Sequence, residues 1–223
     1  DIIDISIRPL VEEKMYEEFR RIEAPVYACM GNHEYYTGEP LARQFCRDAG
    51  ILLLQDSCAP VGTDLLVIGR DDRTNAHRKP LNAILRDGKA QEAAQSRYTI
   101  LMDHQPYHLE QAELAGIDFQ LSGHTHHGQV WPISWITDHV YECSFGLWQR
   151  GRTHYYVSSG LGIWGGKFRI GTQSEYVVAT LMNEEDSEVS NARRQCPHRM
   201  ARCEDTSSPP AAGPSAKHTN IFF

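Results

Sequence analysis

The chain has 223 residues, of which 41% are hydrophobic and 23% are charged, so its composition is that of a globular protein with a sizeable core. Its 22 Lys and Arg against 29 Asp and Glu give a formal net charge of −7, which argues against a broad basic surface for nucleic acid. The longest apolar runs, such as 51–54, are far shorter than the ~20 residues that a membrane-spanning helix needs.

The first elements are a helix and a short strand. Residues 1–4 look like the end of a strand that runs into a loop, and the helical spacing of apolar residues predicts a helix over 11–22. Pro25 ends this helix. The apolar run 26–30 then predicts a buried strand, whose C-terminal tip carries the string Gly31-Asn32-His33-Glu34.

Strands and helices continue to alternate through the middle of the chain. The apolar patterns predict strands over 64–69, 98–102 and 119–121, and helices over 81–94 and 109–115. This alternation is typical of an α/β domain. Polar residues follow the last two of these strands directly, and the ends of strands are where such sheets place their ligands.

The character of the sequence changes after this region. Residues 131–168 contain all four tryptophans and many glycines but no helical period, and strands are predicted over 154–158 and 175–182, which suggests that antiparallel strands close the core. Few sizeable apolar residues follow. We therefore predict one domain over 1–182 and a disordered tail over 183–223, because the tail cannot bury enough surface to offset its ordering entropy.

Side chains suited to bind metal collect at the ends of the predicted strands. They are Asp1, Asn32 with His33, His104, and the pair His124-x-His126. Nitrogen and oxygen ligands without thiolates suit Mn, Fe, Zn or a similar divalent ion. His124 and His126 lie two residues apart, so in an extended segment they project to the same side. Four such sets predict metal binding rather than separate structural histidines.

Four strings in this chain resemble signature blocks of the calcineurin-like metallophosphoesterases. They are Asp1-x-x-Asp4, Gly31-Asn32-His33-Glu34, His104-x-Pro106 and Gly123-His124-x-His126, they occur in the family's order, and the resemblance covers about residues 1–182. It implies two mixed β-sheets flanked by helices. It also implies hydrolysis of a phosphoester, expected to be a phosphodiester, by water activated at a site with two divalent ions (Mn, Fe or Zn).

The resemblance also assigns roles to single residues. Asp1 corresponds to the carboxylate that bridges the two ions, Asn32, His104 and His124 complete the shell of the second ion, and His126 belongs to the first. His33 corresponds to the residue that approaches the phosphate and protonates the leaving oxygen. Asp4 would orient His33.

A longer run narrows the resemblance further. Residues 121–132, followed by 155–162, are similar to a bacterial branch whose members are often membrane-anchored or exported phosphodiesterases. The expected substrate is therefore a phosphoester of a small molecule or a lipid-linked one, with no role for nucleic acid. Any membrane association would come through a segment preceding residue 1.

One block of the family pattern is missing, and it leaves alternatives open. The family's first block, Asp-x-His, supplies two ligands to the first ion and is absent, so we expect the chain to be a fragment that lacks the first strand. The alternative is a non-catalytic fragment that binds one ion. A weaker alternative is a metal-dependent hydrolase that acts on another bond.

Other histidines, cysteines and tryptophans have simpler interpretations. His77 and His108 are predicted to lie on the surface, and His127 either touches substrate or is a solvated loop residue. The tryptophans are expected to pack in the core, with a substrate platform or a surface near a membrane as the alternatives. Two cysteines and two histidines of the tail, with spacing that fits no standard zinc module, are assigned to the disordered tail rather than to a zinc site: Cys196, His198, Cys203 and His218.

Overall fold

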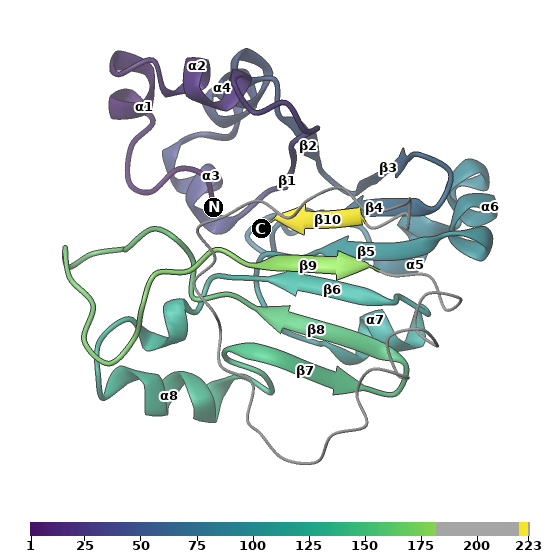
Figure 1. Ribbon diagram of the computed structural model, residues 1–223. Coiled ribbons are helices and arrows are strands. Elements are labelled where there is room, and N and C mark those ends of the chain that lie inside the picture. The colour runs from purple at the N-terminus through teal and green to yellow at the C-terminus, as the bar shows by residue number, and fades with distance from the viewer. Residues whose placement is uncertain (182–218, 223) are drawn as a thin grey trace, which may run out of the picture. The chain divides into compact units, whose positions relative to one another are not determined.

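The computed structural model describes residues 1–181 and 219–222 (Figure 1). The chain forms two compact units, residues 1–175 and residues 176–223. All candidate site residues belong to the first unit. No helix among the described residues combines the length and the apolar character that crossing a membrane requires.

A six-stranded mixed sheet forms the centre of the first unit. Its strands, in spatial order, are β3 (Ser57–Val61), β4 (Leu65–Gly69), β5 (Tyr98–Met102), β6 (Phe119–Ser122), β8 (Thr153–Val157) and β7 (Gly146–Arg150). The four inner strands run parallel, while β3 and β7 pair antiparallel at the two edges. The carboxyl ends of β4, β5 and β6 therefore meet at one edge of the sheet.

A second, two-stranded sheet packs beside the first. It consists of the parallel strands β1 (Tyr27–Cys29) and β2 (Leu52–Leu54). Gly69 of β4 lies against Leu54, where an added Cβ would come within 2.3 Å of the Leu54 Cβ. The helices around this sheet are α1 (Arg8–Glu12), α2 (Met15–Arg20), α3 (Asn32–Thr37) and α4 (Glu39–Ala49). Phe19 and Phe45 pack edge to face in this layer, with ring centroids 6.0 Å apart.

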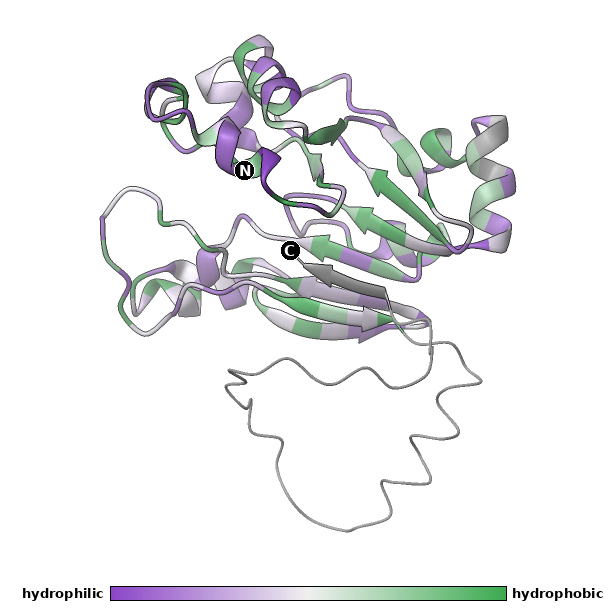
Figure 2. Ribbon diagram, turned by 45° about the horizontal axis from the view of Figure 1, so that its top comes forward, coloured by the Kyte–Doolittle hydropathy of each residue, from purple (hydrophilic) through white to green (hydrophobic). Residues whose placement is uncertain are grey.

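Three further helices flank the six-stranded sheet: α5 (Leu81–Leu85), α6 (Gly88–Ser96) and α7 (Glu110–Leu114). Leu81 and Leu109, at the ends of α5 and α7, are buried in one core with Leu101 of β5 and Tyr155 of β8. Figure 2 shows the apolar character of the central strands. The predicted class, an α/β fold of two sheets flanked by helices, is confirmed.

Two predicted helices were too long. The helix expected over 11–22 is instead α1 and α2, because Lys14 adopts a left-handed conformation (φ 52°, ψ 36°) that no α-helix can continue through. The helix expected over 81–94 is likewise divided into α5 and α6. Asp87, which precedes α6, has an extended ψ of 120°.

The region 131–168 does contain a helix, which the absence of a helical period wrongly excluded. Helix α8 (Ile133–Val140) has no buried residue. Its apolar residues Ile133, Ile136 and Val140 do have helical spacing, and they are exposed. The strand predicted over 154–158 is present as β8. However, it pairs parallel with β6, and only β7 beyond it is antiparallel.

The second unit is described only in part. Strand β9 (Val178–Leu181) lies within the strand predicted over 175–182 and pairs antiparallel with β10 (Thr219–Phe222). The predicted tail is therefore not wholly without structure. The rest of the predicted tail, including Cys196, His198, Cys203 and His218, lies outside the described residues.

Candidate metal centre

Four of the predicted metal ligands come together at the carboxyl edge of the central strands. His104 lies two residues beyond the end of β5, and His124 lies two residues beyond the end of β6. Asn32 is the first residue of α3, which follows β1. Asp1 reaches the same place from the start of the chain. The parallel arrangement of β5 and β6 thus brings together residues that are far apart in sequence.

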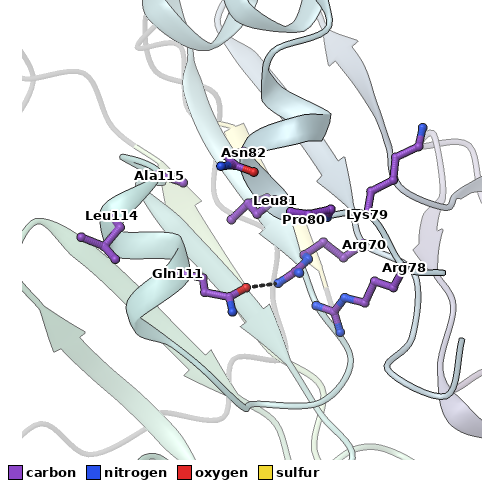
Figure 3. Close-up of a pocket in the computed structure, with 9 residues that line it drawn as sticks. All are labelled: Arg70, Arg78, Lys79, Pro80, Leu81, Asn82, Gln111, Leu114 and Ala115. Atoms are coloured by element: carbon purple, nitrogen blue, oxygen red, sulfur yellow. Dashed lines mark hydrogen bonds between the residues drawn. The ribbon is translucent and has the colours of Figure 1, made fainter. Parts of the chain in front are cut away.

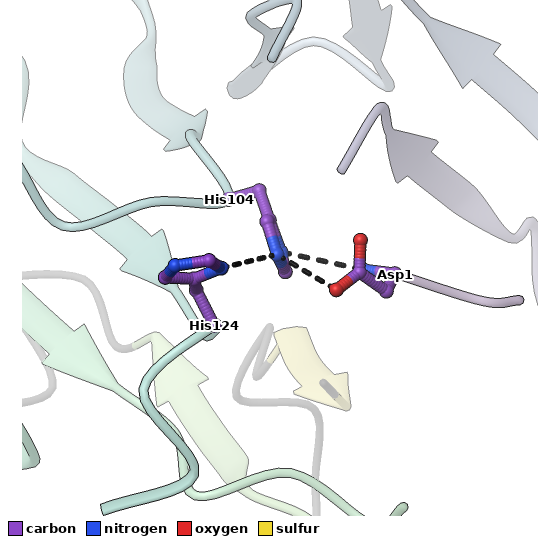
Figure 4. A group of neighbouring side chains, drawn as sticks. All are labelled: Asp1, His104 and His124. Carbon is purple, nitrogen blue, oxygen red and sulfur yellow. Dashed lines mark hydrogen bonds and ion pairs between the residues drawn. The ribbon is translucent and has the colours of Figure 1, made fainter. Parts of the chain in front are cut away.

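The side-chain atoms of this group are close together (Figure 4). His104 Nε2 lies 2.9 Å from Asp1 Oδ2 and 3.1 Å from Asn32 Oδ1. His124 Nδ1 lies 3.0 Å from the same amide oxygen and 3.3 Å from His104 Nε2. Candidate ligand atoms of Asp1, His104 and His124 all lie within 4.8 Å of one another.

These separations fit a divalent ion. With bonds of about 2.1 Å, neighbouring ligand atoms in octahedral or tetrahedral geometry are about 3.0–3.4 Å apart. The chemistry also fits, because burial lowers the pKa of both the His104 and His124 imidazoles. Neutral imidazoles offer the lone pairs that a metal needs. The carboxylate of Asp1, the amide oxygen of Asn32 and the two imidazoles can therefore hold one ion.

The position of Asp1 depends on Glu34, whose role the sequence did not reveal. The buried Glu34 carboxylate accepts the backbone N–H groups of Ile2 at 2.7 Å and Ile3 at 3.0 Å. Its other oxygen accepts the N–H of Gly31 at 2.8 Å. One side chain thus fastens the segment next to Asp1 to the loop that carries Asn32.

We expect the substitution Glu34→Gln to weaken divalent metal binding by about 10–100-fold, because an amide cannot accept all three N–H groups as a carboxylate does. Calorimetric titration with Mn²⁺ measures the effect. Glu39→Gln is the matched control, since Glu39 only pairs with Arg43 on α4. Equal affinities of the two variants would contradict this role for Glu34.

His33 lies at the edge of the group with one ring nitrogen engaged. Its Nδ1 is 2.8 Å from the backbone oxygen of Asp4 and 3.4 Å from the Asp4 carboxylate. Its backbone N–H donates to Asp1 Oδ1 at 3.1 Å. Asp4 therefore contacts the ring through both its backbone oxygen and its carboxylate, and its role as an orienting residue stays a prediction. Among the described residues, no side chain forms a hydrogen bond or ion pair with the His33 Nε2 atom.

The structure does not bring His126 into the group. Its Nδ1 lies 3.4 Å from Nη2 of Arg169, which also donates to the carbonyls of Ser159, Gly160 and Gly162. Burial and then the Arg169 charge lower the pKa of His126 to about 4, so its ring is neutral. Ligation of a first ion by His126 stays a prediction.

The residues on both sides of His104 are tied to the end of β4. Asp103 accepts from Arg70 at 3.1 Å, and Gln105 donates to both carboxylate oxygens of Asp72 at 3.0 Å. These contacts fix the backbone that carries His104. The sequence analysis missed them, although Arg70 and Asp72 directly follow an entirely buried apolar strand. Charged residues directly after a buried strand could have indicated that they support a neighbouring site.

Two of the remaining histidines lie on the surface as predicted, whereas His127 is partly buried and is not a solvated loop residue. His77 and His108 are exposed. The ring of His127 stacks on Phe145, with centroids 4.4 Å apart, and its Nε2 lies 3.9 Å from the carboxylate of Asp138.

Known proteins resemble this chain in sequence over most of its first unit. The sequence model of the calcineurin-like phosphoesterase family matches residues 1–128. An uncharacterised metallophosphoesterase of Helicobacter pylori is 33% identical over 154 residues, covering 68% of this chain and 41% of that protein. One from Campylobacter jejuni is 30% identical over 184 residues, covering 81% of this chain and 48% of that protein.

A bovine relative carries a different name. A transmembrane protein with metallophosphoesterase domain from Bos taurus is 30% identical over 172 residues, covering 67% of this chain and 37% of that protein. The chain thus spans about half or less of the length of these three relatives. No solved structure matches it.

Proposed function

This chain belongs to the calcineurin-like phosphoesterase family, and we propose that its metal centre hydrolyses a phosphodiester with two divalent ions. The observation that carries the proposal is the group Asp1, Asn32, His104 and His124, whose atoms have the spacing of ligands around one ion. In the proposal Asp1 and His126 would hold the second ion, which would supply further positive charge for the phosphate.

Bound divalent ions supply charge for the phosphate oxygens and lower the pKa of a coordinated water towards ~7. Side chains of the protein donate the proton and hold the ligands in position. His33 stands beside the ligand Asn32, and Asp4 holds its Nδ1, so its Nε2 can give a proton to the leaving oxygen. Side-chain hydrogen bonds of Asp103 and Gln105 keep His104 in place while the substrate binds.

Hydrolysis of bis(p-nitrophenyl) phosphate tests the proposed activity. We expect turnover that requires Mn²⁺ and stops when the metal is chelated. Two bound ions per chain would support the dinuclear site. One tightly bound ion without turnover would favour the alternative, a mononuclear metal-binding chain.

The substitution His33→Ala should lower turnover by about 10²–10⁴-fold and leave the metal content unchanged, because His33 is assigned to the leaving group and not to the ions. Steady-state kinetics with elemental analysis measures both quantities. His77→Ala, at an exposed position away from the group, is the control. Loss of metal in step with activity would show that His33 is a ligand or a structural residue.

An exposed apolar surface next to the centre supports a lipid-linked substrate. Three tryptophans expected in the core are instead 56%, 66% and 50% exposed: Trp131, Trp135 and Trp164. They belong to an aromatic ledge formed by Trp131, α8 and the loop that follows β8. It is made of Trp131, Ile133, Trp135, Ile136, Leu161, Ile163, Trp164, Phe168 and Ile170. Exposed apolar surface of this kind marks an interaction site.

Hydrogen bonds join the two segments of the ledge to each other and to the site. Gln129 donates to the carbonyl of Trp164 at 2.7 Å, and the N–H of Trp131 donates to the carbonyl of Ile170 at 2.8 Å. Arg169, within the loop, contacts His126. Tryptophan suits the interface of a lipid bilayer, where its ring is buried and its N–H stays hydrated. A lipid headgroup would then lie close to the metal ligands.

We expect the full chain to bind phospholipid vesicles, and the double substitution Trp135→Ser with Trp164→Ser to weaken this binding by at least about tenfold. Hydrolysis of a water-soluble substrate should stay unchanged. Leu41→Ser, which removes an exposed apolar side chain from α4, is the control. Vesicle sedimentation decides the matter: unchanged binding of the double variant would contradict the role of the ledge.

A further inference from the structure

A cationic trough lies on the face of the six-stranded sheet that α5 and α7 cover. Its volume is about 470 Å³, within the range of small-molecule sites, and its lining is drawn in Figure 3. The lining residues are Arg70, Arg78, Lys79, Pro80, Leu81, Asn82, Gln111, Leu114 and Ala115. Nothing in the family resemblance or in the proposed function assigns a role to this trough.

The trough is distinct from the metal centre. Beneath it lies Asp103, whose side chain follows the alternation of β5 onto the same face as Leu101. Leu101 packs there with Leu81 and Leu109, next to α5 and α7. His104, one residue later, points instead towards Asn32 on the side of the two-stranded sheet. The two sites therefore use opposite sides of the same strand end.

The charge of the trough is positive in a chain whose net charge is −7. Arg70, Arg78 and Lys79 contribute three positive charges, and no carboxylate is part of the lining. Asp103 offsets one of them. The carboxylate of Asp56, beside the trough, accepts the backbone N–H groups of Asp71 and Lys79. At least one positive charge remains in excess, and a low-dielectric hollow strengthens its attraction for anions.

The two guanidinium groups are held in place and are incompletely satisfied. Arg70 Nη1 donates to Asp103 Oδ2 at 3.1 Å and to Gln111 at 3.0 Å, and Arg78 donates to the same carboxylate oxygen. Their side chains are only 8% and 10% exposed. Among the described residues, neither buried Nε–H has an acceptor. Oδ1 of Asp103 likewise has no donor among the described residues. Two guanidinium groups thus share one carboxylate oxygen, so their combined charge exceeds that of Asp103.

A neighbouring hollow is lined by the same arginines. It measures about 310 Å³ and shares Arg70, Arg78 and Gln111 with the trough. Its lining adds Arg73, whose guanidinium lies 4.2 Å from the centre of the Tyr107 ring. No carboxylate lines this hollow either.

We propose that the trough binds a phosphate group, either as the free ion or as part of a small organic phosphate. Arginine donors suit the several oxygens of a phosphate, and Lys79 at the exposed rim supplies a mobile charge. Pro80, Leu81 and Leu114 flank these donors with apolar surface, which an organic part can cover.

Calorimetric titration of the full, Mn²⁺-loaded chain with inorganic phosphate and with glycerol 3-phosphate tests the proposal. The substitution His124→Ala serves as background, because it removes oxyanion binding at the metal centre. In that background phosphate should still bind, more weakly as ionic strength rises, and Lys79→Ala or Arg78→Gln should lower its affinity by about tenfold. Tighter binding of glycerol 3-phosphate would identify an organic phosphate, and equal binding the free ion.

Arg86→Ala is the matched control, because it removes a nearby exposed positive charge from outside the lining. Two results would overturn the proposal. One is the loss of all phosphate binding in the His124→Ala background. The other is unchanged affinity in Lys79→Ala, an exposed position where misfolding does not complicate the result. Neither result depends on whether the chain hydrolyses phosphoesters.

Discussion

The substitution His124→Ala should reduce metal-dependent hydrolysis by at least about 1,000-fold and remove tight binding of a divalent ion. His124 Nδ1 is one of four candidate ligand atoms that lie 2.9–3.3 Å from a neighbour in the group, and alanine removes this atom. Metal titration and turnover of bis(p-nitrophenyl) phosphate should therefore fall together.

His127→Ala provides the comparison for this result. His127 belongs to the same run of histidines but stacks on Phe145, away from the ligand atoms. Its removal should leave metal affinity within about threefold of the parent value. Wild-type metal affinity in His124→Ala would show that the group is a hydrogen-bonded cluster and not a metal site.

Gly31→Ala should abolish the metal site by a purely steric route, although it changes no ligand. An added Cβ would lie 1.9 Å from Oδ1 of Asp1 and 2.8 Å from its Cγ. The backbone of Gly31 is extended (φ −113°, ψ 178°), so alanine is allowed there and only the contact matters. The Asp1 carboxylate must move away, and we expect metal affinity to fall at least about 100-fold.

The control is Gly123→Ala, because Gly123 adjoins His124 and has no atom within 4 Å of an added Cβ. The circular dichroism spectra of both variants should resemble that of the parent chain. Metal binding by Gly31→Ala equal to that by Gly123→Ala would mean that Asp1 does not contribute to the site.

The grouping of Asn32, His104 and His124 could be predicted from the sequence because each follows a short apolar strand. His104 and His124 lie two residues after short apolar runs, and parallel strands deliver such residues to one edge of a sheet. The supporting contacts could not be predicted in this way. Glu34 holds Ile2 and Ile3 across more than thirty residues, and no local pattern specifies that pairing.

The errors in the secondary structure also have physical causes. The left-handed Lys14 divides the first predicted helix at a residue with no glycine signal. The prediction missed helix α8 although Ile133, Ile136 and Val140 have helical spacing. The helix is short, and these apolar residues are exposed rather than packed in the core. Trp131, Trp135 and Trp164, which were expected in the core, are likewise exposed. The sequence alone does not distinguish an exposed tryptophan from a packed one.

Anomalous diffraction from crystals of the chain grown with Mn²⁺ tests the central claim most directly. We predict a manganese peak within about 2.0–2.3 Å of Asp1 Oδ2, Asn32 Oδ1, His104 Nε2 and His124 Nδ1. A peak bound by other residues, or full manganese occupancy elsewhere with these four side chains still bonded to each other, would contradict the assignment of this group as the metal centre.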